Sequence, residues 1–231
     1  IRDRITELGG SIVGEAYQPL GSDQFETIVA DIKKSKPAVI LNTINGDSNI
    51  SFFQYLREAG IDAAAIPTIS FSTTEEEIER IGPELMADDY VVWNYFQSLD
   101  TNANRSFVER FQTKYGKHRV IGDGAASAYA AVYLFAEAAK RAKSDDVQAI
   151  RAAAKGISWN APEGTMQIDT DSQHTHRTTR VGQIQSDGQM KAIWQSSTPL
   201  KPDPYPKYKS QEEWGLFLEK WYKKWGKKWA K

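Results

Sequence analysis

Short apolar segments alternate with amphipathic segments over the first ninety residues, and this alternation restricts the fold more than any other feature. The apolar segments have the length of strands, and the amphipathic ones repeat apolar side chains at helical spacing, as Phe25, Val29 and Ile32 do. In chain order, the predicted strands and helices cover residues 11–17, 23–34, 37–41, 48–59, 67–71, 73–81 and 89–93. Such alternation with short connections predicts an α/β protein in which a parallel sheet is flanked by helices. Ser72 and Glu75 have capping-box spacing, so we expect a helix to begin at Thr73.

The pattern changes after residue 100. Helical spacing predicts helices over residues 101–115, 123–142 and 145–155 with no strand between them, so we expect this stretch to pack on another sheet. From Trp159 the chain becomes strand-like. The predicted strands there include residues 164–168, 180–184 and 190–194.

The end of the chain is predicted to be an amphipathic helix. Its apolar stripe consists of Trp214, Phe217, Leu218, Trp221 and Trp225, and lysines occupy positions between them. We expect the stripe to dock against protein while the lysines stay in water. Contact with a membrane or a nucleic acid is the alternative for this combination of basic and aromatic residues.

Composition excludes several function classes. The 231 residues contain no cysteine, which removes thiol catalysis, disulfides and thiolate metal sites. The 29 Lys and Arg balance 30 Asp and Glu, which argues against a nucleic-acid partner. No apolar run approaches the ~20 residues of a membrane-spanning helix, so we expect no stable membrane insertion.

Motifs for catalysis are missing. The glycine-rich nucleotide loops and the G-x-S-x-G hydrolase motif do not occur. His174 and His176 have no nearby cysteine or acidic cluster, which is weak evidence for a metal site. We therefore predict a binding protein and not an enzyme, with no catalytic residue, no cofactor and no metal.

The chain begins with Ile1 inside a helical segment that Gly9 and Gly10 close. Neither a methionine nor a capping residue precedes this segment. Because native domains rarely begin inside a helix, we expect an upstream part of the protein to be missing, together with any export signal.

Polar side chains follow two of the predicted strands. Residues 42–49 follow the strand at 37–41, and residues 70–74 follow the strand at 67–71, with Asp47 among the candidate contacts in the first loop. Ligands bind parallel sheets at the carboxyl ends of the strands, beside helix N-termini. Small hydroxyl and amide groups there suit a small polar solute. Helix capping explains the same residue types, and both interpretations stay open.

Several segments resemble the urea-type and short-chain amide-type substrate-binding proteins of ABC transporters. Amide-sensing regulators of amidase operons are similar over the same stretches. The matching segments are LNTINGDSN (41–49), FF (52–53), EEEI (75–78), GPE (82–84), WNYFQS (93–98), NAPEG (160–164), QHT (173–175) and PDPY (202–205). The likeness runs in order over nearly the whole chain.

This resemblance implies a type I periplasmic-binding-protein fold, in which two α/β lobes joined by hinge crossovers close on a ligand. It divides the chain into four parts and places the hinge at Trp93, Asn94 and Tyr95. The parts are 1–92, the main part of the second lobe; 93–158, a hinge crossover and a first-lobe helical segment; 159–198, the return to the second lobe; and 199–231, the tail helix. The first lobe would be only partly present.

The resemblance also implies solute contacts in the two polar loops. The expected ligand-binding residues are Ile44, Asn45, Gly46, Asp47, Ser70, Ser72 and Thr73. Asn45 stands where a valine is expected. The helix start at Asp123 departs from the more acidic family pattern, so the resemblance assigns Asp123 no role.

The implied function is that of an extracytoplasmic solute-binding protein of an ABC importer. It would bind urea or a short-chain amide in the cleft between its lobes and deliver it to a membrane ABC permease. Its place would be the periplasm or the extracellular face of a bacterial membrane. Two alternatives stay open: a cytosolic amide-sensing regulator of the same fold, and a branched-chain amino-acid-binding protein.

Overall fold

A computed structural model describes residues 1–229 of the chain. Ala230 and Lys231, the end of the predicted tail segment 199–231, lie outside the described residues. The chain forms two compact units, one of residues 13–200 and one that combines residues 1–12 with the chain from residue 201 onward. Among the described residues, no helix combines the length and the apolar character that crossing a bilayer requires.

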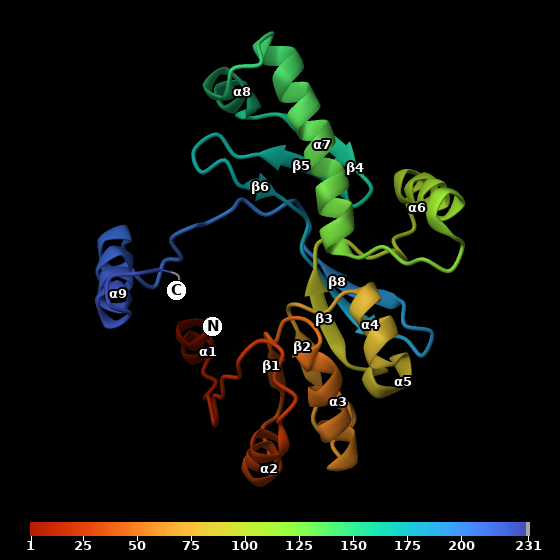
Figure 1. The fold of residues 1–231 in the computed structure, drawn as a ribbon, viewed down its shortest axis with the longest axis vertical. Helices are drawn as coiled ribbons and strands as arrows, with labels where there is room; N and C mark the ends of the chain where they lie inside the picture. The colour runs from red at the N-terminus through yellow and green to blue at the C-terminus, as the bar shows by residue number, and fades with distance from the viewer. Residues whose placement is uncertain (230–231) are drawn as a thin grey trace. The chain divides into compact units, whose positions relative to one another are not determined.

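The larger unit contains a five-stranded mixed sheet, which Figure 1 shows with its helices. Its strands, in spatial order, are β1 (Ile40–Asn42), β2 (Thr68–Ser70), β3 (Tyr90–Trp93), β7 (Arg180–Ile184) and β8 (Met190–Gln195). The first three strands are parallel, as predicted, whereas β7 pairs antiparallel with β3 and β8 antiparallel with β7. The carboxyl ends of β1, β2 and β3 therefore lie along one edge of the sheet.

Four helices accompany this sheet: α2 (Glu26–Ser35), α3 (Ser48–Glu58), α4 (Glu75–Ile81) and α5 (Pro83–Met86). Their apolar faces form one core with the sheet, in which Phe53, Leu56, Ile78, Val91 and Ile184 are wholly buried. The helical spacing read from the sequence is thus confirmed for α2, α3 and α4, whereas α5 was not predicted. Burial of such side chains is the main stabilising contribution, at about 1.5–3 kcal/mol each.

The strand predicted over residues 11–17 is wrong, because these residues have no regular secondary structure. Val13 and Tyr17 are 57% and 85% exposed, and no strand among the described residues pairs with this segment. An alternating pattern creates a strand only when a neighbouring strand satisfies its backbone groups.

The capping box predicted at Ser72 and Glu75 is also wrong, because the box lies two residues later in the chain. The cap is formed by Thr74 and Glu77, so α4 begins at Glu75. Ser72 donates its hydroxyl to the Ile44 carbonyl instead, and Glu75 is buried, where its Oε1 accepts the Gln97 N–H at 2.8 Å. Tertiary partners therefore outcompete the local cap.

The middle of the chain forms a second group of helices and strands with its own core. It consists of α6 (Asn102–Tyr115), α7 (Asp123–Ala142), α8 (Val147–Ala154) and a three-stranded sheet of β4 (Ser158–Ala161), β5 (Gly164–Ile168) and β6 (Thr175–His176). Ala130, Leu134 and Ala138 of α7 pack against Ile157 and Met166. The expectation that this helical stretch packs on another sheet is confirmed.

The smaller unit contains α1 (Arg2–Glu7) and α9 (Gln211–Lys224). Glu7 pairs with Lys207 at 2.5 Å, and Asp3 pairs with Lys209 at 2.7 Å. Ser210 caps α9 in a capping box with Glu213. No residue of α9 is fully buried, although Trp214 and Trp221 are half-buried within the smaller unit. The docking of the aromatic stripe against protein stays a prediction.

Candidate functional site

The loop after β1 is shaped by two buried asparagines. Asn42 Nδ2 donates to Asn49 Oδ1 at 2.9 Å and to Ser70 Oγ at 3.1 Å, and Asn42 Oδ1 accepts the Ile44 N–H at 2.9 Å. Asn49 Nδ2 donates to the carbonyls of Ile44 at 2.8 Å and Gly46 at 3.3 Å. These bonds fix the loop that the sequence assigned to the solute. Sequence reasoning missed the supporting role of Asn42 and Asn49, although both lie in the polar segment it singled out.

The loop after β2 is tied to the first one. The Ser72 hydroxyl donates to the Ile44 carbonyl, so the two polar loops meet at this bond. Ser72 and Ile44 are half-buried, whereas Ser70 and Thr73 are wholly buried. The structure therefore brings the predicted residues of both loops together at one edge of the sheet.

Thr73 is unusual among these residues because its hydroxyl is buried and makes no hydrogen bond to any described residue. Its backbone carbonyl accepts the Trp93 indole N–H at 2.6 Å. A buried hydroxyl without a partner costs about 1–3 kcal/mol. The Ser48 and Thr68 hydroxyls are buried without a partner as well, and a water or a ligand can provide one.

The outer rim of the first loop is accessible. Asn45 and Asp47 are exposed, and Gly46 has a φ of 71°, a left-handed conformation that glycine adopts without strain. The Asp47 carboxylate pairs with Arg80 at 2.9 Å, with both side chains more than half exposed. Asp47 is therefore engaged with α4 at the rim of the loops.

The predicted hinge residues lie at the carboxyl end of β3, on the same edge of the sheet as the two polar loops. The backbone N–H groups of Asn94 and Tyr95 donate to Asp123 Oδ1 at 3.2 Å and 2.8 Å. Asn94 Nδ2 donates to the Thr178 carbonyl at 3.1 Å. Residues 93–95 thus connect the segment that leaves β3 to the segment that enters β7 and to the start of α7.

Asp123 belongs to a buried ion cluster that sequence reasoning missed. Arg177 pairs with Asp123 at 3.0 Å and with Glu163, and Arg180 donates to the carbonyls of Asn94 and of Glu163, the latter at 2.8 Å. Hydrogen bonds and ion pairs to these carboxylates hold the pKa of Arg177 above its usual range, although burial opposes this shift. Asp123 and Arg177 lie 54 residues apart along the chain, so no local pattern predicts their pairing.

Glu75 is a buried acid near this ion cluster, because the charge of Asp123 acts on its carboxyl group. Burial raises the pKa of Glu75 to about 8, and hydrogen bonds from Gln97 and its own backbone oppose the rise only in part. Its Oε2 has no partner among the described residues, and neither has the buried Tyr95 hydroxyl. Burial likewise raises the pKa of Tyr95. Both groups are consequently neutral near pH 7.

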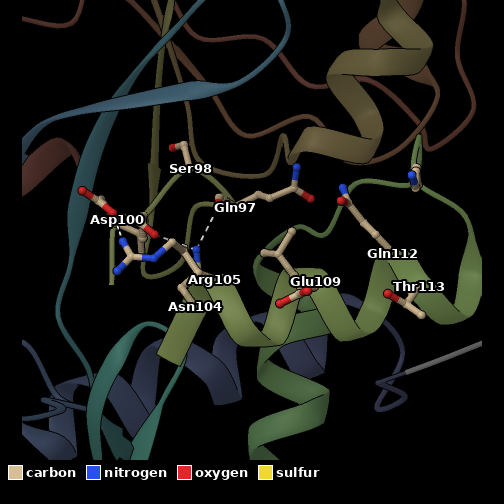
Figure 2. A pocket seen from close by; sticks show the side chains of 11 residues that line it. Gln97, Ser98, Asp100, Asn104, Arg105, Glu109, Gln112 and Thr113 are labelled. Carbon is tan, nitrogen blue, oxygen red and sulfur yellow. Dashed lines mark hydrogen bonds and ion pairs between the residues drawn. The ribbon is translucent and has the colours of Figure 1, made fainter. Parts of the chain in front are cut away.

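A surface cavity lies elsewhere, between α6 and the loop after Tyr95. Its volume is about 700 Å³, and Figure 2 shows the polar side chains that line it. Arg105 there is engaged by Asp100 and Asn102, and Asn104 Nδ2 donates to the Gln97 and Leu99 carbonyls at 2.8 Å. None of the predicted ligand-binding residues lines this cavity or another one of about 460 Å³ beside Ser98 and Met190.

His176, one of the two histidines considered as metal ligands, pairs with a carboxylate instead. His176 contacts Asp169 at 3.0 Å, and hydrogen bonds from Ser172 and His176 hold the pKa of Asp169 well below its usual range. Within residues 1–229, no group of three or more His, Asp or Glu side chains is arranged to hold a metal ion.

Known proteins resemble this chain over most of its length. A family model of the periplasmic binding protein domain matches residues 1–211. Leu/Ile/Val-binding protein homolog 6 of Brucella melitensis biotype 1 is 25% identical over 174 residues, which are 73% of this chain and 44% of that protein. A protein named limonene hydroxylase from Geobacillus stearothermophilus is 32% identical over 124 residues, which are 54% of this chain but 23% of that protein.

The fold agrees with a solved structure. A solute-binding protein of an ABC transporter from Rhodopseudomonas palustris HaA2, in complex with p-hydroxybenzoic acid, superposes with a TM-score of 0.78 at 21% identity. The match covers 90% of this chain and 57% of that one, so the chain spans roughly half the length of such relatives. The predicted type I periplasmic-binding-protein fold is confirmed, and this chain belongs to the periplasmic binding protein domain family.

Proposed function

We propose that this chain is part of an extracytoplasmic solute-binding protein that delivers urea or a short-chain amide to a membrane ABC permease. The solute lies against residues 44–46 and Ser72–Thr73, in a cleft that closes about Trp93, Asn94 and Tyr95. In this proposal residues 13–92 belong to the lobe that carries these loops. The return to this lobe, expected from residue 159, is placed at residue 180 instead, because β4, β5 and β6 form a separate sheet that packs against α7.

The charge distribution supports a neutral solute. The segments 42–47 and 70–77 contain no Lys or Arg that could pair with a carboxylate ligand. Their acids have protein partners: Asp47 pairs with Arg80, Glu76 accepts the Gly122 N–H at 2.7 Å, and Glu77 completes the cap of α4. Glu75, the fourth acid, is buried and neutral at pH 7. An ammonium or a carboxylate would find no counter-charge free in these loops.

The observation that carries the proposal is the unpaired Thr73 hydroxyl beside the bond between Ser72 and Ile44. Urea and short amides present donors and a carbonyl within a few ångströms, and a buried site must pair each of them. Hydroxyl and backbone groups of two converging loops provide such partners. A solute that pairs with Thr73 removes the cost of the buried unpaired hydroxyl.

A thermal-shift screen of the full-length gene product that contains these residues tests the ligand class. Urea, formamide and acetamide are expected to raise Tm at millimolar concentration, because a ligand that binds only the folded state stabilises it. Leucine and p-hydroxybenzoate should leave Tm unchanged. A response to leucine alone would contradict the choice of ligand, and turnover of an amide would contradict the assignment as a binding protein.

A branched-chain amino acid is the second candidate solute, because the Brucella relative is named as a Leu/Ile/Val-binding protein homolog. Such a ligand needs an anion partner for its ammonium and a donor set for its carboxylate.

The cytosolic amide sensor, the other alternative, would bind its amide with the same loops. Fractionation of the native cell distinguishes it, since a sensor stays in the cytosol and a transporter component lies outside the inner membrane.

A further inference from the structure

One face of α9 and the residues after it carry an aromatic stripe, which is half-buried at Trp214 and Trp221 and exposed at its other members within the smaller unit. We define the aromatic stripe as Trp214, Phe217, Trp221, Trp225 and the following Trp229. Neighbouring rings contact one another, with centroids 5.8 Å, 6.2 Å, 5.8 Å and 5.9 Å apart along this order. Phe217, Trp225 and Trp229 remain 43%, 53% and 58% exposed. Exposed apolar surface of this extent marks an interaction site.

The same segment is strongly basic. Residues 220–228 contain five lysines and no acid, and every one of these lysines is exposed. The Lys224 ammonium lies 4.4 Å from the Trp221 ring centroid, and Lys223 pairs with Glu219 at 2.8 Å on the polar side of the helix. The lysines therefore flank the aromatic stripe, and their charge complements an anionic partner.

This composition favours a lipid surface over a protein groove. Helices that lie in the membrane interface combine a Trp- and Leu-containing face with lysines whose long stems reach the phosphate groups. Tryptophan prefers the interface because its ring is apolar and its N–H is polar. The match to the binding-protein family model ends at residue 211, where α9 begins, so the match does not extend over this helix.

We propose that α9 binds the surface of an anionic phospholipid bilayer, with the aromatic stripe at headgroup depth and the lysines at residues 220–228 on the lipid phosphates. The contact is peripheral, since no helix of the described residues is suited to span the bilayer. It adds a membrane-targeting element to the protein and does not depend on which solute the loops bind.

Vesicle sedimentation with the full-length gene product tests the proposal. Vesicles of phosphatidylcholine and phosphatidylglycerol in equal amounts are expected to bind the protein, with a blue shift of tryptophan fluorescence. Pure phosphatidylcholine vesicles should bind at least about tenfold more weakly, and added salt should weaken the anionic binding. Equal binding to both vesicle types, or no binding, would overturn the proposal.

Three variants identify the contact surface. The double substitution Trp221→Ala and Trp225→Ala should weaken vesicle binding by at least about tenfold, because it removes the inserted rings. The matched control is Leu216→Ala: Leu216 is 60% exposed and lies two residues from Trp214, on the opposite side of the helix, so its loss should change binding less than about twofold. Replacing Lys220, Lys224, Lys227 and Lys228 by Gln should abolish the preference for anionic vesicles.

Circular dichroism confirms that each variant remains folded. If Leu216→Ala weakens binding as much as the double tryptophan substitution, the face assignment is wrong. A stripe that instead drives concentration-dependent dimerisation in sedimentation velocity, with no response to vesicles, would show that a second copy covers it and would refute the lipid proposal.

Discussion

At the scale of single residues, the unpaired Thr73 hydroxyl has opposite effects on stability and on ligand binding. It lowers the stability of the ligand-free state, because it is buried without a hydrogen bond, and it offers a partner to a polar solute. Valine has nearly the same shape and no hydroxyl. Thr73→Val is therefore expected to raise the free energy of unfolding without ligand by about 1 kcal/mol. Chemical denaturation in urea-free guanidinium measures this change, and a large loss of stability would show that the hydroxyl has a structural partner.

Glu75 provides a pH-dependent prediction at the same scale. Its pKa is about 8 in the folded protein and 4.5 in an unfolded chain, so the folded state retains a proton that the unfolded state releases as pH rises. Stability is unaffected below pH 4.5, falls between pH 4.5 and 8, and stays reduced above pH 8. Glu75→Gln removes this loss, and its advantage over the native protein should grow across the same interval to at most about 5 kcal/mol.

Denaturation curves at pH 4.5, 6 and 8 measure the difference between Glu75→Gln and the native protein. The matched control is Glu79→Gln, because Glu79 lies exposed on the same helix. The control should follow the native pH profile. A constant difference between Glu75→Gln and the native protein at all three pH values would contradict the neutral, buried state of Glu75.

At the scale of elements, the start of α7 approaches the start of α4 closely because Gly122 has no side chain. A Cβ at residue 122 would lie 2.2 Å from Glu76 Oε2 and 2.6 Å from Thr74 Cβ. Gly122→Ala should therefore break the bond between Glu76 and the residue 122 N–H and destabilise the protein by about 1–3 kcal/mol. Gly124→Ala is the control, since nothing lies within 4 Å of its Cβ position and alanine favours the helix. Thermal melts compare the two, and equal Tm values would contradict this contact.

The ion cluster of the crossover segments predicts a second contrast between elements. Asp123→Asn keeps an oxygen for the N–H groups of Asn94 and Tyr95 but leaves Arg177, whose side chain is 17% exposed, with Glu163 as its remaining anionic partner. Loss of the single partner of a buried ion costs about 3–5 kcal/mol, and the remaining Glu163 should keep the loss here below that range but above about 1 kcal/mol. Asp47→Asn removes an exposed pair and should cost less than about 1 kcal/mol. Similar losses in both variants would show that Asp123 is not part of a buried network.

At the scale of the whole molecule, sequence patterns predicted the helices, because a helix depends on the local spacing of apolar residues. The helices at Asn102–Tyr115 and Asp123–Ala142 agree with the prediction to within a residue, because their apolar faces repeat every turn. The segment 11–17 failed, since a strand depends on a neighbour that its own residues do not reveal. Asp123, Arg177 and Glu163 were missed for the same reason: their partners are distant in sequence.

The candidate site likewise has features that the sequence predicted and features that only the folded chain defines. The polar loops at residues 44–47 and 70–73 were predicted from their positions after strands, and the structure brings them together. The unpaired state of the Thr73 hydroxyl and the neutral state of Glu75 follow from burial, which only the folded chain defines. Membership in the periplasmic binding protein family was reached from motifs in the right order.

Calorimetric titration of urea into the full-length gene product and its Thr73→Val variant tests the central claim most directly. We predict saturable binding to the native protein and at least about tenfold weaker binding to the variant, which remains folded and at least as stable. Equal affinities of the two proteins for urea, or binding of leucine with no heat from urea, would contradict the account.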